Sequence, residues 1–149
     1  MGVRERNVRI RASGYAVFPI LVGGAIYLVC RPETLLVFSW ADNVGLSPFI
    51  ALAREHLGWV CDEAPSWIIF NLPNGMWAFS LFAVIKVIWG TRAPEAMFWL
   101  LLAFIFTFGL EIGQAISLVP GTFDPADLYA MLTGAIIALI IVRSNGVEG

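Results

Sequence analysis

The hydrophobic positions of this chain gather into four long apolar runs, separated by short polar stretches and by one long mixed segment. The runs cover residues 12–30, 67–89, 96–119 and 125–142. A helix needs about 20 apolar residues to cross the roughly 30 Å hydrocarbon layer of a bilayer, and each run is close to that length. Because open strands would leave backbone polar groups unpaired in lipid, the pattern predicts an all-α membrane protein with four transmembrane helices.

The overall composition agrees with this prediction. Apolar residues make up 59% of the 149 residues, and charged residues make up 13%. Soluble domains are about 45–50% apolar. A chain of this length predicts a single domain over residues 1–149. The basic residues form no aromatic-interleaved patch, so we do not expect nucleic-acid binding.

The basic residues also predict the orientation of the helices. Of the nine Lys and Arg residues, seven precede the first run, follow the fourth, or flank the turn between the second and third, and the other two are Arg31 and Arg54. Basic residues next to membrane helices are retained on the cytoplasmic side. We therefore expect both termini in the cytoplasm, and the 31–66 segment and the 120–124 turn outside.

Residues 1–30 also have the basic start and the apolar run of a cleavable signal peptide. However, the bulky segment Tyr27-Leu-Val29 precedes Cys30, where a cleavage site needs small residues. We expect this run to stay in the protein as its first membrane helix.

The long mixed segment predicts a short interfacial helix. Ser47 followed by Pro48 is typical of a helix start, and Gly58 of a helix end. The residues between them place apolar side chains on one side, as in helices that lie on a membrane surface. A lid that only covers the helix ends is favoured over one that grips a ligand.

The two cysteines and the single histidine fall in or beside this outer segment. Cys30 and Cys61 can close it as a disulfide. The sequence gives no distance between them, however, and we expect two unpaired thiols. His56 has no second histidine, and no cysteine at ligand spacing, so we expect neither a metal site nor a cofactor.

Polar residues interrupt the outer ends of the second and third runs. Glu111 and Gln114 are three residues apart on one helix face, at depths of about 12 and 7.5 Å below Val119. Asn71 and Asn74 reach depths of roughly 6 and 10 Å in the second run. An ionised side chain at the centre of a membrane helix costs ~2.5–3.5 kcal/mol on insertion scales, so such groups mark a protein interior or a wet cavity.

Asp124 and Asp127 begin the fourth run, and with the polar residues of the second and third runs they predict one outward-opening polar cavity. Asp124 before Pro125 also fits a helix N-cap, and Asp127 fits the acidic first turn that the helix dipole favours. Nothing in the local sequence requires an acid at Glu111. We take Glu111 and Asp127 as the candidate catalytic acid and base, and the candidate binding residues are Gln114, Asn71, Asn74 and Asp124.

The binding candidates have structural explanations as well. Pro73 and Gly75 interrupt the second run at the same depth, and Asn71 and Asn74 can satisfy backbone groups freed there. Gln114 can hydrogen-bond to a neighbouring helix.

Small residues predict close helix packing beside these polar groups. Gly109 and Gly113 form a Gly-x-x-x-Gly pattern in the third run, which lets a neighbouring helix approach. Ala130, Gly134 and Ala138 form a ladder of small residues on the Asp127 side of the fourth run. We expect the third run to pack between the second and the fourth.

The order of these motifs resembles the VanZ-like family of small bacterial membrane proteins, named after a protein linked to low-level teicoplanin resistance. The resemblance covers roughly the last 80 residues and includes the segment Leu72–Trp77 of the preceding helix. Its matching positions are Glu111, Gln114, Asp124, Asp127 and Gly134. The resemblance implies a multi-pass protein of the bacterial cytoplasmic (inner) membrane.

Two positions depart from the family's pattern. The family often has an arginine in the outer turn, where this chain has Gly121-Thr122, and an asparagine four residues after the second acid, where it has Met131. An anion site that depends on that arginine is therefore not expected here.

Three functional classes stay open. The first is a cell-envelope protein that binds or processes a membrane lipid or cell-wall precursor at the polar cavity, with carboxylates acting as acid and base or holding a divalent cation. The second is a non-enzymatic subunit of a larger membrane-protein complex. The third is a proton- or ion-coupled transporter, which with four helices would need to be a homo-oligomer.

Overall fold

The computed structural model describes residues 3–89, 94–119 and 121–142, with side chains from Gly14 onwards. Within these ranges the chain forms seven α-helices and no strand, so the predicted all-α class is confirmed. The helices, in chain order, are α1 (Val3–Cys30), α2 (Leu36–Asn43), α3 (Ser47–Glu63), α4 (Ser66–Phe70), α5 (Leu72–Trp89), α6 (Pro94–Ala115) and α7 (Pro125–Ile141).

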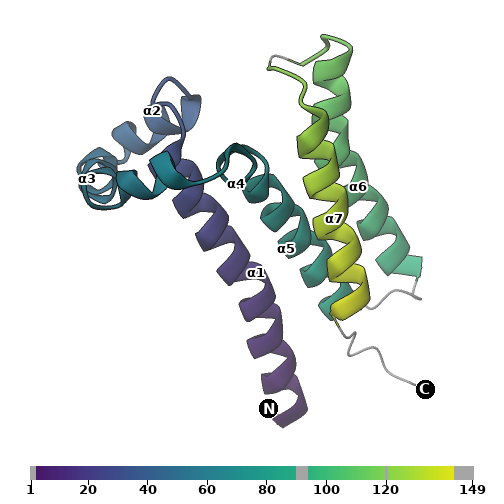
Figure 1. Cartoon of the computed structure of the whole chain (residues 1–149). Coiled ribbons are helices and arrows are strands. Elements are labelled where there is room, and N and C mark those ends of the chain that lie inside the picture. The colour runs from purple at the N-terminus through teal and green to yellow at the C-terminus, as the bar shows by residue number, and fades with distance from the viewer. Residues whose placement is uncertain (1–2, 90–93, 120, 143–149) are drawn as a thin grey trace.

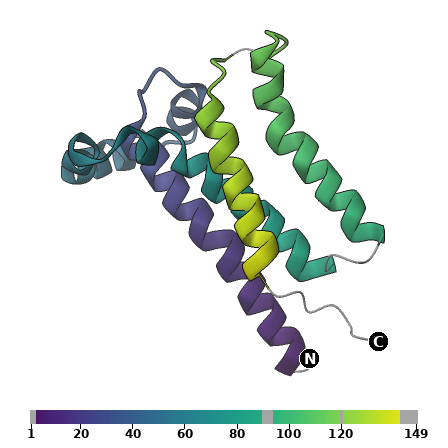
Figure 2. The ribbon, with the colours of Figure 1, turned by 45° about the vertical axis from the view of Figure 1, so that its right-hand side comes forward.

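Four long helices, α1, α5, α6 and α7, form a bundle, and α2 and α3 form a cap at one end of it (Figure 1). We call this end the cap end. The helix α5 lies at the centre and packs extensively against α7 and α1, whereas α6 contacts α5 and α7 less and stands at the edge (Figure 2). The expectation that the third run packs between the second and the fourth is therefore wrong, because α5 is the central helix.

Two of the described helices, α5 and α6, are long and apolar enough to cross a membrane. The apolar part of α1, Gly14–Cys30, and α7 are also apolar but shorter. Large apolar side chains are exposed along α6, among them Phe98, Leu101 and Phe106. Soluble monomers rarely expose apolar patches of this extent, so the exposed surface of α6 suits lipid or another protein.

The helices α5 and α7 approach until their backbones touch. A Cβ atom added to Gly75 would lie 2.9 Å from the carbonyl oxygen of Ala130, and one added to Gly134 would collide with the carbonyl oxygen of Gly75. By contrast, a Cβ at Gly109 or Gly113 would meet only atoms of the same segment. The small-residue ladder of the fourth run is thus a packing face, and the predicted role of the Gly-x-x-x-Gly pattern is wrong.

The contact between α1 and α5 includes a polar link. Pro19 lies inside α1 and has no N–H to donate to the carbonyl of Tyr15. The hydroxyl of Ser80 on α5 donates to the carbonyl of Tyr15 at 3.1 Å and to that of Ala16 at 2.6 Å. Ser80 therefore satisfies the backbone that the proline leaves open.

Several helix ends differ from those predicted. The second run is divided into α4 and α5 at Asn71, and Pro73 lies in the first turn of α5, where a helix tolerates proline. The helix α3 continues through Gly58 to Glu63, because one glycine costs a helix only ~1 kcal/mol. The start of α7, in contrast, is as predicted.

The third run ends as a helix at Ala115, four residues earlier than predicted. The N–H groups of Leu118 and Val119 both donate to the carbonyl of Gly113, and Ser117 adopts a left-handed φ of 59°. This is a helix-terminating turn of the Schellman kind. Because the helix stops here, the last turn of α6 contains Gln114 and lies close to the start of α7.

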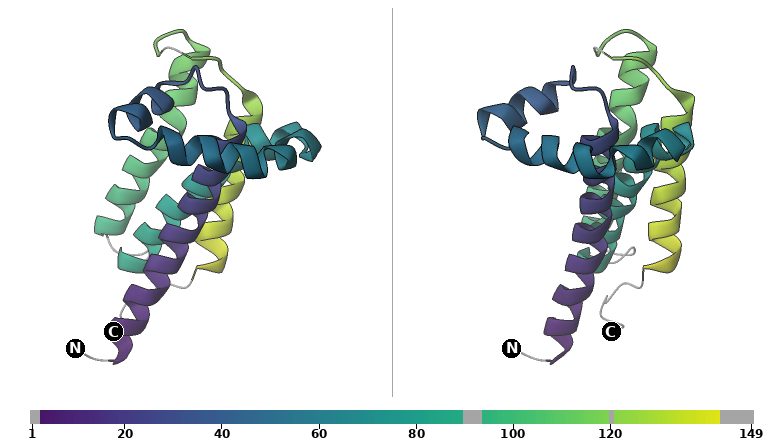
Figure 3. Two further views of the ribbon diagram at one scale, coloured as in Figure 1. Left: turned by 90° about the vertical axis from the view of Figure 1, so that its left-hand side faces the viewer. Right: turned by 60° about the vertical axis from the view of Figure 1, so that its left-hand side comes forward.

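The cap is joined covalently to α1. Cys30 at the end of α1 and Cys61 in α3 form a disulfide, with their Cα atoms 5.5 Å apart, so the expected free thiols are wrong. The two cysteines meet because α3 lies across the end of α1 (Figure 3). Closing a loop of 31 residues is worth about 3–4 kcal/mol in the chain-entropy account.

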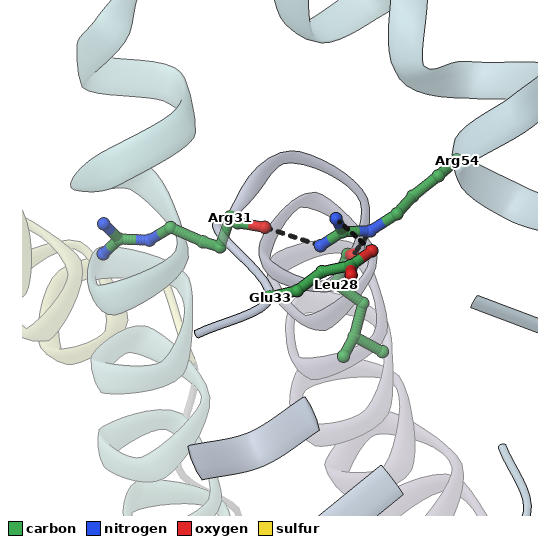
Figure 4. A network of polar contacts seen from close by, with 4 residues as sticks. All are labelled: Leu28, Arg31, Glu33 and Arg54. Carbon is green, nitrogen blue, oxygen red and sulfur yellow. Dashed lines mark hydrogen bonds and ion pairs between the residues drawn. The ribbon is translucent and has the colours of Figure 1, made fainter. Parts of the chain in front are cut away.

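Arg54 of α3 makes a second link between the cap and α1. Its guanidinium donates to the carbonyls of Leu28 and Arg31 at 2.9 and 2.5 Å, and pairs with Glu33 at 3.0 Å (Figure 4). It also lies over the ring of Phe38, 4.7 Å from the centroid. A cation at a helix C-terminus satisfies free carbonyls and complements the helix dipole, so Arg54 has a structural role.

The α5–α7 contact predicts unequal effects of alanine at two glycines. Gly134→Ala should lower stability by about 1–3 kcal/mol, because the methyl group collides with the backbone of α5. Gly24→Ala is the matched control, because its Cβ would meet nothing within 4 Å. Thermal unfolding of the purified protein in detergent measures both, and equal melting temperatures for the two variants would contradict the close packing.

Candidate functional site

The site begins with Asn71, which lies between α4 and α5 at the cap end of the bundle. Its Nδ2 donates to Oδ1 of Asp127 at 2.8 Å and to Oδ2 of Asp124 at 3.0 Å. Asn71 is 8% exposed and Asp127 is 9% exposed. One buried amide group therefore holds two carboxylates from the start of α7.

Asp124 is the N-cap of α7, as predicted. Its backbone is extended, and Oδ1 accepts a hydrogen bond from the N–H of Ala126 at 2.9 Å. Pro125 follows at the first helical position, where its missing N–H has no helical acceptor to lose. One carboxylate oxygen of Asp124 thus caps the N-terminus of α7, and the other accepts the hydrogen bond from Asn71.

Glu111 faces the start of α7 from the neighbouring helix α6. Its Oε2 accepts a long hydrogen bond, 3.5 Å, from the backbone N–H of Asp124. Glu111 thus lies beside the start of the fourth run, one of the segments with which it is expected to share a polar cavity. Because α6 ends at Ala115, Glu111 lies only about 6 Å from the helix end, half the predicted depth.

The other two candidates lie beside this cluster. The side chain of Gln114 covers Gly121 in the turn before α7, where a Cβ would come within 2.6 Å of Nε2. Asn74 is half-buried on α5 and makes no side-chain hydrogen bond with the described residues. We therefore define the polar cluster as Asn71, Glu111, Asp124 and Asp127.

An apolar groove opens beside the polar cluster, between α1, α5 and α7. Its volume is about 530 Å³. Asn71 lies at its cap end together with two exposed aromatic side chains, Trp67 and Tyr129. Apolar residues form most of the remaining lining, including Phe18, Leu72, Met76, Phe79 and Ile137.

Sequence reasoning did not identify this groove. Its only sequence signal is the small-residue ladder of the fourth run, which brings α7 against α5 and leaves the side facing α1 open.

The polar cluster contains three carboxyl groups, and none of them forms an ion pair within the described chain, although the guanidinium of Arg31 lies near and donates to the carbonyl of Phe70 at 3.3 Å. Among the described residues the one ion pair is that of Arg54 with Glu33. The same residues contain no group of three histidine, cysteine or acidic side chains placed to hold a metal ion. Hydrogen bonds from Asn71 and from backbone N–H groups therefore supply the stabilisation of these carboxylates within the described chain.

Comparison with protein-family models, curated proteins and solved structures found no match to this chain. The resemblance to the VanZ-like family therefore stays a prediction from the motifs around Glu111 and Asp127.

The two asparagines near the start of α5 predict a contrast in stability. Asn71→Ala removes the donor shared by Asp124 and Asp127 and should cost about 1–3 kcal/mol. Asn74→Ala removes no hydrogen bond seen among the described residues and should change stability by less. Chemical or thermal unfolding in detergent compares them, and a larger loss for Asn74→Ala would refute the assignment of Asn71 as the organising residue.

Proposed function

We propose that this chain is a VanZ-like integral protein of the bacterial cytoplasmic membrane that binds a lipid, or a lipid-linked cell-wall precursor, at the polar cluster. The observation that carries this proposal is the apolar groove that ends at Asn71, which is bonded to Asp124 and Asp127. An apolar channel with a few polar groups at one end is typical of sites for amphipathic ligands.

In this proposal four segments cross the membrane: α1, α4 with α5, α6 and α7. Both termini are cytoplasmic and the cap is outside. The distribution of basic residues supports this orientation. The disulfide between Cys30 and Cys61 supports it independently, because disulfides persist in oxidising compartments. The polar cluster then lies near the outer surface.

The cap would lie in the interfacial region of the outer leaflet. It exposes large apolar and aromatic side chains, among them Trp40, Phe49 and Trp59. A second apolar groove of about 590 Å³ lies between the cap and α1. Amphipathic helices with such surfaces bury their apolar side in the boundary between headgroups and acyl chains.

If the site acts chemically on its lipid, Glu111 and Asp127 would be the acid and base. They come from different helices and both contact the Asn71–Asp124 unit, directly or through the backbone. Catalysis would require an acid and a base at defined positions relative to the reacting bond, whereas binding requires only polar groups beside the groove. The geometry therefore supports binding better than catalysis.

A non-enzymatic subunit of a larger membrane complex is the second candidate function. The observation in its favour is the largely exposed apolar surface of α6 at the edge of the bundle. A transporter has less support, because the polar cluster occupies one end of the helices and a transport path needs polar groups at greater depth.

Lipid retention tests the proposed function. The full chain, purified from bacterial membranes in detergent, should carry phospholipid that mass spectrometry detects. Thr133→Phe places a large side chain in the groove and should reduce the bound lipid severalfold, whereas Leu132→Phe, at an exposed position of α7 that does not line the groove, should not. A stoichiometric protein partner, with no lipid that depends on the groove, would favour the complex-subunit function instead.

Cysteine labelling tests the orientation. Because Cys30 and Cys61 are paired, one added cysteine supplies the reactive thiol. Thr122→Cys, in the turn before α7, should react with an impermeant maleimide in intact cells, whereas Glu95→Cys, at the start of α6, should react only after the membrane is opened. Reaction of Glu95→Cys in intact cells would reverse the proposed topology.

A further inference from the structure

Arg31, which follows α1 directly at the cap end, has hydrogen-bonding capacity that the protein does not use. A guanidinium carries five N–H groups. That of Arg31 makes one described hydrogen bond, from Nη2 to the carbonyl of Phe70 at 3.3 Å. Its Nε is buried and has no hydrogen-bond partner among the described residues. Because an unpaired donor on a partly buried cation is costly, an acceptor at the remaining N–H groups would stabilise the residue.

Arg54, the other arginine at this end of the bundle, differs from Arg31 in this respect. Each of its three guanidinium nitrogens donates, to the carbonyls of Leu28 and Arg31 and to the carboxylate of Glu33. Arg31 makes no ion pair with the described residues. Its bond to Phe70 links α1 to α4, but this structural role uses only one of its donors.

Two aromatic rings hold the guanidinium of Arg31 in place. Its central carbon lies 4.7 Å from the centroid of the Phe70 ring and 5.2 Å from that of the Tyr27 ring. A stacked guanidinium keeps its donors available, because its N–H groups lie in its own plane. Figure 4 shows the side chain pointing away from Arg54 and Glu33. The cation is therefore positioned in advance, and its exposed end is directed away from the other charges of the cap.

The carboxyl groups of the polar cluster do not occupy this cation. Phe70 and Asn71 are consecutive, so their side chains leave the chain about 100° apart. Asn71 faces the carboxylates at the start of α7, whereas Phe70 faces Arg31 at the end of α1. The acids and the guanidinium thus lie on different sides of this segment, and an anion at Arg31 does not have to pass the acids.

The surroundings of Arg31 select the kind of anion. Phe70, against the guanidinium, is 40% exposed, and Trp67, one turn before it on α4, is 58% exposed. Arginine donors pair well with phosphate oxygens, often through two parallel hydrogen bonds. A phospholipid can use both the donors and the exposed rings, whereas a free phosphate ion can use only the donors.

We propose that Arg31 binds the phosphate group of a membrane phospholipid whose acyl chains lie along Phe70 and Trp67. The apolar part of α1 ends at Cys30, so Arg31 lies where the hydrocarbon of a membrane gives way to headgroups. Trp67 also borders the apolar groove, but Arg31 and Phe70 do not. The inference therefore adds a second lipid site outside the groove, and it rests on the proposed function only for the membrane location.

The dependence of lipid binding on phosphate tests this inference. The full chain in detergent is titrated with phosphatidylglycerol and with diacylglycerol of identical acyl chains, and binding is measured by native mass spectrometry. Diacylglycerol lacks the phosphate. We expect phosphatidylglycerol to bind roughly tenfold more tightly, as for one charge-assisted hydrogen bond, and inorganic phosphate should not displace it.

Substitutions assign the preference to Arg31. Arg31→Gln removes the charge, so the preference should fall to nearly one. Asn43→Asp, at an exposed position of α2, lowers the net charge by the same amount and should keep the preference. Arg31→Lys keeps the charge but cannot form two parallel hydrogen bonds, so it should retain part of the preference. This variant and the comparison of lipids on the unaltered chain decide the inference even if Arg31→Gln fails to fold.

The outcomes separate this inference from the proposed function. Equal binding of the two lipids, or a preference that survives Arg31→Gln, would overturn the phosphate site. Displacement by inorganic phosphate at a concentration comparable to that of the lipid would assign the site to a soluble anion and overturn the lipid. Loss of the preference in Thr133→Phe would place the phosphate in the groove, which contradicts a second site but not the proposed function. Bound lipid that Thr133→Phe does not reduce would overturn the proposed function and leave the Arg31 site intact.

Discussion

The contact between the backbones of α5 and α7 is the constraint on which the candidate site depends. In lipid, where the proposed function places these helices, burying apolar side chains gives helices little reason to associate, so close packing of small residues becomes decisive. Gly75 lies against Ala130, and the two helices run parallel, since both start at the cap end. One helical turn toward the cap end, α5 reaches Asn71 and α7 reaches Asp127, and these two side chains bond to each other. The register that places Gly75 against Ala130 therefore also places Asn71 beside Asp127.

A separate set of links positions α1, the third wall of the groove. Ser80 joins α5 to the carbonyls beside the Pro19 turn, and a Cβ at Gly23 would come within 2.8 Å of the indole of Trp77. At the cap end, the disulfide and Arg54 hold α3 on the last turn of α1. The groove thus lies between helices that are each fixed to α5, and its width does not depend on α6. This is the arrangement expected of a preformed binding site.

The sequence patterns correctly predicted features that depend on interactions within one helical turn. Asp124 with Pro125 identified the start of α7, because an N-cap and its proline act within one turn. Distances between remote segments were outside the reach of such patterns. The pairing of Cys30 with Cys61 depends on how α3 crosses α1, and the central place of α5 depends on which glycines face which helix. The groove was missed for the same reason, since it is a property of three helices together.

The residues of the polar cluster fall into two parts, which differ in how extensively their helices pack. Asn71, Asp124 and Asp127 lie at the cap end of the tightly packed α5–α7 pair, and the hydrogen bonds among them link the two helices there. Glu111 belongs to α6, which packs less extensively and meets the cluster through one long hydrogen bond. Loss of this one hydrogen bond would leave the α5–α7 contact unchanged. Glu111 is therefore the member of the cluster whose charge contributes least to the fold, and an effect of its removal on ligand binding would report on function more directly than a change at Asp127.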